Sequence, residues 1–120
     1  MNVVLILDDD PRAGGYIDRA LSRRGYVTIV TYNVAAAQAA LANIKGVRVI
    51  VADDDLGTHW TGRDFLADVK QTHPDILCVL TSDLWRPQQD REDLSSYNLF
   101  CPKPVNLDWF TQYIQSYMVA

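Results

Sequence analysis

Four short apolar runs of this chain each end on residues whose types suit a divalent cation or a phosphoryl group. The endings are two aspartate triplets, a threonine and a lysine: Asp8–Asp10 after residues 3–7, Asp53–Asp55 after residues 47–52, Thr81 after residues 76–80, and Lys103–Pro104 after residues 99–102. Carboxylates are hard oxygen ligands for a divalent cation, while a hydroxyl and an amine can stabilise phosphoryl oxygens. If the four endings meet, they can bind a cation and a phosphoryl group together.

Elements that would bring these endings together are also visible in the sequence. Short apolar runs closed by polar residues are typical of strands in a parallel sheet that is covered on both faces. The carboxyl ends of such strands line up along one edge of the sheet, where ligands bind. We therefore expect the aspartates, Thr81 and Lys103 to converge at that edge.

Helical and strand patterns fill the intervals between the runs. The predicted elements are a helix over 11–24, a strand over 26–32, a helix between Asn33 and Gly46, a helix over 62–72, a weak helix beginning near Pro87, and a helix over 106–117. Strand and helix thus alternate five times, which with right-handed crossovers predicts a doubly wound α/β sandwich. Gly14 and Gly15 are locally unfavourable in the first helix, but small residues there would permit close backbone approach.

Composition limits the class of protein. The 120 residues predict one domain spanning 1–120, and no apolar stretch approaches the roughly 20 residues of a membrane span. A net charge of −4 without a Lys/Arg cluster argues against nucleic acid as a direct partner. Without a signal peptide, and with Cys78 and Cys101 inside predicted strands, the chain is expected in the cytoplasm with reduced thiols.

The order of these motifs resembles the receiver domain of response regulators in two-component signal transduction, and the resemblance covers essentially the whole chain. That family has an acidic pair after its first strand, a phosphoacceptor aspartate after the third, Ser or Thr after the fourth, and Lys-Pro after the fifth. Asp8–Asp9, Asp53, Thr81 and Lys103–Pro104 occupy these places in order. The resemblance implies a flavodoxin-like (βα)5 sandwich whose five-stranded parallel sheet has the strand order 2-1-3-4-5.

The same resemblance implies a role for each residue of the site. Asp53 would accept a phosphoryl group from a sensor histidine kinase or a histidine phosphotransfer protein, with Mg²⁺ as cofactor. The carboxylates of Asp9 and Asp53 and the main-chain carbonyl of Asp55 would hold the Mg²⁺, with Asp8 acting directly or through water. Lys103 and Thr81 would contact phosphoryl oxygens, and a cis peptide is expected before Pro104. Such a domain is not an enzyme toward other substrates, because it catalyses only its own phosphorylation and dephosphorylation.

Several alternatives stay open at this point. Asp54 is the second candidate for the phosphoacceptor, because choosing Asp54 shortens the loop between the acceptor and Gly62 to a length that is common in the family. A pseudo-receiver, which binds partners without phosphorylation, is the alternative function. A phosphatase of the haloacid-dehalogenase type is disfavoured, because the second acidic cluster precedes Thr81 and Lys103. Trp109 and Tyr113 would either form a surface for a downstream target or homodimer, or cover the edge of the sheet.

Overall fold

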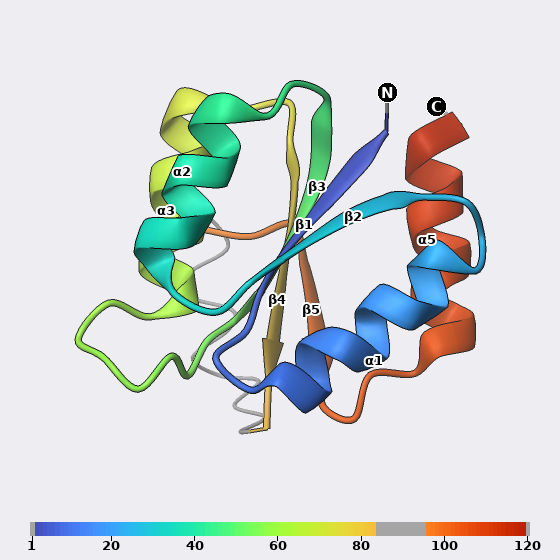
Figure 1. The fold of residues 1–120 in the computed structure, drawn as a ribbon, viewed down its shortest axis with the longest axis horizontal. Coiled ribbons are helices and arrows are strands. Elements are labelled where there is room, and N and C mark those ends of the chain that lie inside the picture. Colours follow the sequence, from blue (N-terminus) through green and yellow to red (C-terminus); the bar gives the residue numbers. More distant parts are fainter. Residues whose placement is uncertain (1, 84–95, 120) are drawn as a thin grey trace.

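A five-stranded parallel sheet forms the centre of the molecule, as seen in a computed structural model that describes residues 2–83 and 96–119 (Figure 1). The strands are β1 (Val3–Leu7), β2 (Val27–Thr31), β3 (Val47–Asp53), β4 (Leu77–Ser82) and β5 (Leu99–Pro102). Their spatial order is β2-β1-β3-β4-β5, and all four pairings are parallel. The expected flavodoxin-like arrangement with the order 2-1-3-4-5 is therefore confirmed.

Helices cover both faces of this sheet. They are α1 (Pro11–Ser22), α2 (Val34–Asn43), α3 (Gly62–Thr72) and α5 (Leu107–Val119). Figure 1 shows α2 and α3 on one face and α1 and α5 on the other. The weak helix predicted near Pro87 lies outside the described residues. Within the described part of the chain, no helix has both the length and the apolar character that crossing a membrane requires.

Each face of the sheet contributes to a separate half of the core. Leu5 and Ile50 belong to the half that packs against α2 and α3, whereas Val4 and Val51 belong to the half that packs against α1 and α5. Successive residues of a strand point to opposite faces, so a strand covered on both sides must be apolar along its whole length. The continuous apolar runs of the sequence satisfy this requirement.

Side-chain caps begin the helices where the sequence predicts. The carboxylate of Asp10 accepts from the backbone N–H of Arg12 before α1, and Asn33 accepts from Ala36 before α2. Helix α1 ends at Ser22, slightly before the predicted boundary, because the next residues tighten into a turn that reaches Gly25 at φ 86°.

Gly14 explains how α1 lies so close to the sheet. A Cβ atom on Gly14 would lie 3.2 Å from Cγ1 of Val30 and 3.8 Å from Cβ of Asp8. The absence of a side chain lets the first turns of α1 approach the ends of β1 and β2. The predicted close backbone approach is therefore present at Gly14, whereas Gly15 meets little except the flexible end of Arg19.

Candidate functional site

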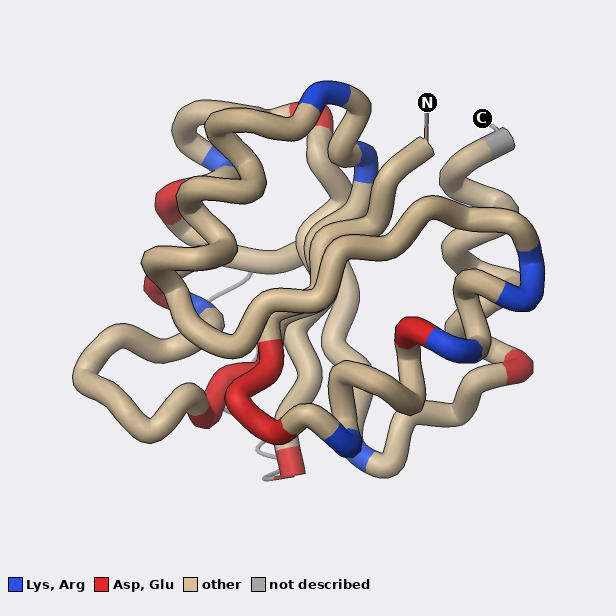
Figure 2. The backbone as a smooth tube through the Cα atoms, viewed as in Figure 1, with Lys and Arg blue, Asp and Glu red and all other residues tan. Residues whose placement is uncertain are grey.

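The polar endings of β1 and β3 converge at one edge of the sheet, where Figure 2 shows the acidic residues gathered. Carboxylate oxygens of Asp8, Asp9 and Asp53 all lie within 4.8 Å of one another. Asp8 and Asp53 are nearly buried, with 2% and 5% of their surface exposed, whereas Asp9 is exposed. Two carboxylates are thus held out of water while a third faces it.

Lys103 provides the positive charge of the site. Its Nζ lies 2.9 Å from Oδ2 of Asp8 and 3.3 Å from Oδ2 of Asp53, so one ammonium group bridges the ends of β1 and β3. The backbone N–H of Lys103 donates to the carbonyl of Ser82 at 2.9 Å, which anchors the residue beside β4. The peptide bond between Lys103 and Pro104 is cis, as expected.

Burial and neighbouring charges shift the pKa values of Asp53 and Lys103. Burial and the nearby negative charge of Asp8 raise the pKa of Asp53 to about 6, against the lowering effect of Lys103. Burial lowers the pKa of Lys103, but its hydrogen bond to Asp8 and the charges of both carboxylates outweigh this and raise it overall. Lys103 therefore stays protonated, and Asp53 is ionised above about pH 6.

The raised pKa of Asp53 leads to a prediction about stability without metal. The folded protein binds the Asp53 proton more tightly than the unfolded chain does, so the free energy of unfolding falls as pH rises from about 4 to 6. We expect Asp53→Asn to stabilise the protein by up to about 3 kcal/mol at pH 8 and by much less at pH 4. Urea unfolding of both proteins in EDTA measures this difference, and an equal effect at the two pH values would contradict it.

The donor set fits a hard divalent cation. Three carboxylates face one ammonium group, so at neutral pH the cluster keeps an excess of negative charge. Oδ1 of Asp8 already accepts from the N–H of Asp10 at 2.9 Å, and its Oδ2 is bound by Lys103. The carboxylate oxygens of Asp9 and Asp53 are therefore more available to a cation than those of Asp8. All-oxygen ligation with room for water on the exposed side suits Mg²⁺.

Asp55 and Thr81 lie next to this cluster without joining it directly. The N–H of Asp55 donates to Oδ1 of Asp53 at 3.4 Å, while the Asp55 carboxylate accepts from Gly57 at 3.1 Å. Thr81 is the register partner of Asp53 across β3 and β4. Its hydroxyl is buried and donates to the carbonyl of Ala52 at 3.4 Å, a long and therefore weak bond. The hydroxyl can exchange that bond for another acceptor at little cost.

Asp54, the alternative phosphoacceptor, points away from the cluster. Its Oδ2 lies 3.3 Å from Nε of Arg63, and its Oδ1 accepts from the N–H of Arg63 at 3.3 Å. The Asp54 side chain is thus engaged by the first turn of α3, whereas Asp53 faces Lys103. Sequence reasoning missed this pairing, because a separation of nine residues across a loop carries no periodic signal.

Gly62 was also not recognised as part of the site. A Cβ atom there would lie 2.2 Å from the carbonyl oxygen of Asp53, a distance that no real Cβ contact reaches. The N–H of Gly62 donates to the carbonyl of Asp54 at 3.1 Å. The start of α3 therefore rests directly on the backbone of Asp53 and Asp54. Thr61 caps α3, because its hydroxyl accepts from the backbone N–H of Asp64 at 3.2 Å. A glycine directly after such a capping residue is the signal that could have indicated this close approach.

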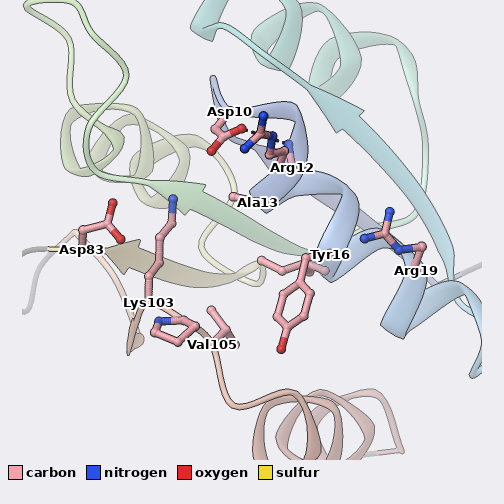
Figure 3. A pocket seen from close by; sticks show the side chains of 10 residues that line it. Asp10, Arg12, Ala13, Tyr16, Arg19, Asp83, Lys103 and Val105 are labelled. Carbon is pink, nitrogen blue, oxygen red and sulfur yellow. Dashed lines mark hydrogen bonds between the residues drawn. The ribbon is translucent and has the colours of Figure 1, made fainter.

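An open hollow of about 490 Å³ lies beside the cluster, between α1 and the segment after β5 (Figure 3). Tyr16 of α1, Val105 and Asp83 contribute to its wall, and so does Lys103, which contacts the cluster. Arg12 also lines it. Lys103 is therefore reachable from this side, which gives a second molecule room to approach.

Comparison with known proteins identifies the fold. No protein-family model matches the sequence, and no curated protein sequence matches it. Among the solved structures, a two-component response regulator from Clostridium difficile matches with 18% sequence identity and a TM-score of 0.89, covering 98% of this chain and 96% of that chain. The receiver domain of the Francisella response regulator 1452 matches with 21% identity and a TM-score of 0.85, covering 96% of this chain and 94% of that chain. The Vibrio cholerae chemotaxis protein CheY4 matches with 19% identity and a TM-score of 0.85, covering 97% of this chain and 98% of that chain. The chain therefore has the fold of CheY-like response-regulator receiver domains over nearly its whole length.

Proposed function

We propose that this chain is a phosphoacceptor receiver domain that takes a phosphoryl group on Asp53 from a phosphorylated histidine of a partner protein. The observation that carries the proposal is the bridge from Lys103 to the buried carboxylates of Asp8 and Asp53, with Asp9 alongside, at the carboxyl edge of a receiver fold. A buried carboxylate beside a fixed ammonium group is suited to receive a highly charged phosphoryl group.

The chemistry is a substitution at phosphorus. An oxygen of Asp53 forms the new O–P bond, the P–N bond to the donor imidazole breaks, and that nitrogen keeps the electron pair and takes a proton from water. Bound Mg²⁺, held by Asp9, Asp53 and the Asp55 carbonyl with help from Asp8, would offset charge on the phosphoryl oxygens. Lys103 contributes a fixed positive charge, and Thr81 can turn its hydroxyl to a phosphoryl oxygen. Positioning and electrostatics supply most of the catalysis.

In this proposal the domain is not an enzyme toward other molecules. It assists its own phosphorylation and the later attack of water on the acyl phosphate, and the phosphorylated form signals through protein contacts. The partners are a sensor histidine kinase or a histidine phosphotransfer protein, and then a downstream protein or a second receiver. Cys78 and Cys101 are unpaired buried thiols, which is compatible with the reducing cytoplasm where we place the chain.

Intact mass after incubation with acetyl phosphate tests the proposal. We expect the wild type to gain one phosphoryl group in the presence of Mg²⁺, and to gain none in EDTA. Asp53→Asn should abolish the gain, whereas Asp54→Asn is the matched control and should retain it, because Asp54 faces Arg63.

Other outcomes of the mass measurement would assign the phosphoacceptor role differently. If Asp53→Asn still gains the group and Asp54→Asn does not, Asp54 is the acceptor. A structural neighbour, the DrrB receiver domain, has been solved in a BeF3-activated form, so the same ion with Mg²⁺ is a second probe here. A wild type that responds to neither acetyl phosphate nor BeF3 would be a pseudo-receiver that binds partners without phosphorylation.

A further inference from the structure

Residues 25–44 contain no Asp, Glu, Lys or Arg, although charged residues make up 22% of the chain. This uncharged segment comprises β2, the turn after it and α2. Figure 2 shows it as uninterrupted tan along the front of the molecule, with charged residues beyond both of its ends. Another protein surface can therefore pack closely against this segment without supplying charges opposite to those of the segment.

Strand β2 is an edge of the sheet with its outer side open in Figure 1. The carbonyl of Thr31 accepts from the N–H of Asp8, so the backbone groups of Thr31 and Ile29 face β1. Backbone groups alternate in direction along a strand, so those of Thr28 and Val30 point away from the sheet. An outward row of this kind is a template for pairing with another strand.

The edge lacks the features that usually prevent such pairing. Proteins protect open edges with lysine, proline or a bulge. Strand β2 contains neither residue, and its described register with β1 is unbroken over all five residues. Two large apolar side chains are exposed at the ends of the strand: Val27, its first residue, is 44% exposed, and Tyr32, directly after its last residue, is 51% exposed.

Helix α2 extends the uncharged surface beside the strand. Of its residues, all of which the structure describes, Ala37 alone is fully buried. Ala35 and Ala39 are exposed, and side chains this small let another backbone come close. On the other flank, Asp18 of α1 accepts hydrogen bonds from the hydroxyls of Thr28 and Ser22, so its charge is already partly compensated.

We propose that β2 pairs antiparallel with β2 of a second copy of this chain, about a two-fold axis at Ile29. Thr28 would exchange backbone hydrogen bonds with Val30 of the second copy, and Ile29 would lie opposite its own equivalent. In a two-fold contact the residues near the axis lie against their own equivalents, so a charge at this position would meet a like charge. Two copies of a chain with net charge −4 repel each other on average, and a contact through the uncharged segment adds no further like-charge repulsion.

Sedimentation velocity over a wide concentration range, reaching the millimolar level, tests the proposal. We expect the wild type to shift from monomer to dimer. Val27→Lys should raise the dimer dissociation constant at least about tenfold, because pairing would bury a lysine at the edge. Trp60→Lys is the matched control: Trp60 is 43% exposed, lies outside the segment and receives the same charge change, so the dimer should persist.

Amide hydrogen exchange followed by NMR locates the contact. In the wild type, the amides of Thr28 and Val30 should become protected as concentration rises, whereas in Val27→Lys they should exchange at concentration-independent rates. A wild type that stays monomeric at millimolar concentration overturns the proposal. So does a dimer that Val27→Lys leaves intact, or one that forms without protection of these two amides.

Discussion

Gly62→Ala is expected to destabilise the protein by about 3 kcal/mol and to weaken Mg²⁺ binding at the same time. The added Cβ would lie 2.2 Å from the carbonyl oxygen of Asp53 and 2.7 Å from its carbonyl carbon. Both atoms belong to the backbone of a central strand, so neither can move without shifting the Asp53 carboxylate or lifting α3 from the sheet. Urea unfolding and calorimetric titration with Mg²⁺ measure the two effects.

Gly15→Ala is the matched control for this prediction. Gly15 lies inside α1, and a Cβ atom there would meet only the flexible end of Arg19, at 3.3 Å. Alanine in place of glycine within a helix should therefore stabilise the protein, by about 0.5–1 kcal/mol. The same chemical change is thus expected to have opposite signs at two positions. A Gly62→Ala protein with wild-type stability would show that α3 is not held against the Asp53 backbone.

The fold was largely predictable from the sequence because its strands are buried on both faces. A strand such as β1, apolar along its whole length and followed directly by aspartates, has few alternatives to a buried strand of a parallel sheet. Alternation with helical patterns then limits the topology to a doubly wound sheet. Strand order came from the resemblance to receiver domains, and the structure agrees with it.

The site was predictable as a set of residues but not as a geometry. Motif order identified Asp53 and Lys103, yet nothing in the sequence gives the 3.3 Å between them, because it depends on how the segment after β5 folds back. The choice between Asp53 and Asp54 depended on motif spacing. In the structure, by contrast, Arg63 engages Asp54, and this contact is formed only when α3 packs beside the end of β3. Residue order therefore identified the residues of the site, but it did not predict the contacts between side chains of different elements.

Lys103→Met is expected to cost about 3 kcal/mol or more of stability at pH 8 in EDTA. The Lys103 side chain is 13% exposed and its Nζ contacts Asp8 and Asp53, whose side chains are 3% and 6% exposed. Methionine keeps most of the side-chain volume but removes the charge, so two buried carboxylates are left facing each other. Removing one partner of a buried ion pair is costly because the remaining charge stays desolvated. Urea unfolding measures the loss.

Mg²⁺ should restore much of this loss, because a divalent cation at the cluster would replace the missing positive charge. The stabilisation on adding Mg²⁺ is thus expected to be larger for Lys103→Met than for the wild type. Lys45→Met is the matched control: Lys45 is exposed, so its loss should change stability little with or without Mg²⁺. If both variants lose the same stability, Lys103 does not neutralise the buried carboxylates. If Lys103→Met is destabilised but Mg²⁺ does not restore it, the carboxylates need the lysine but do not form the cation site.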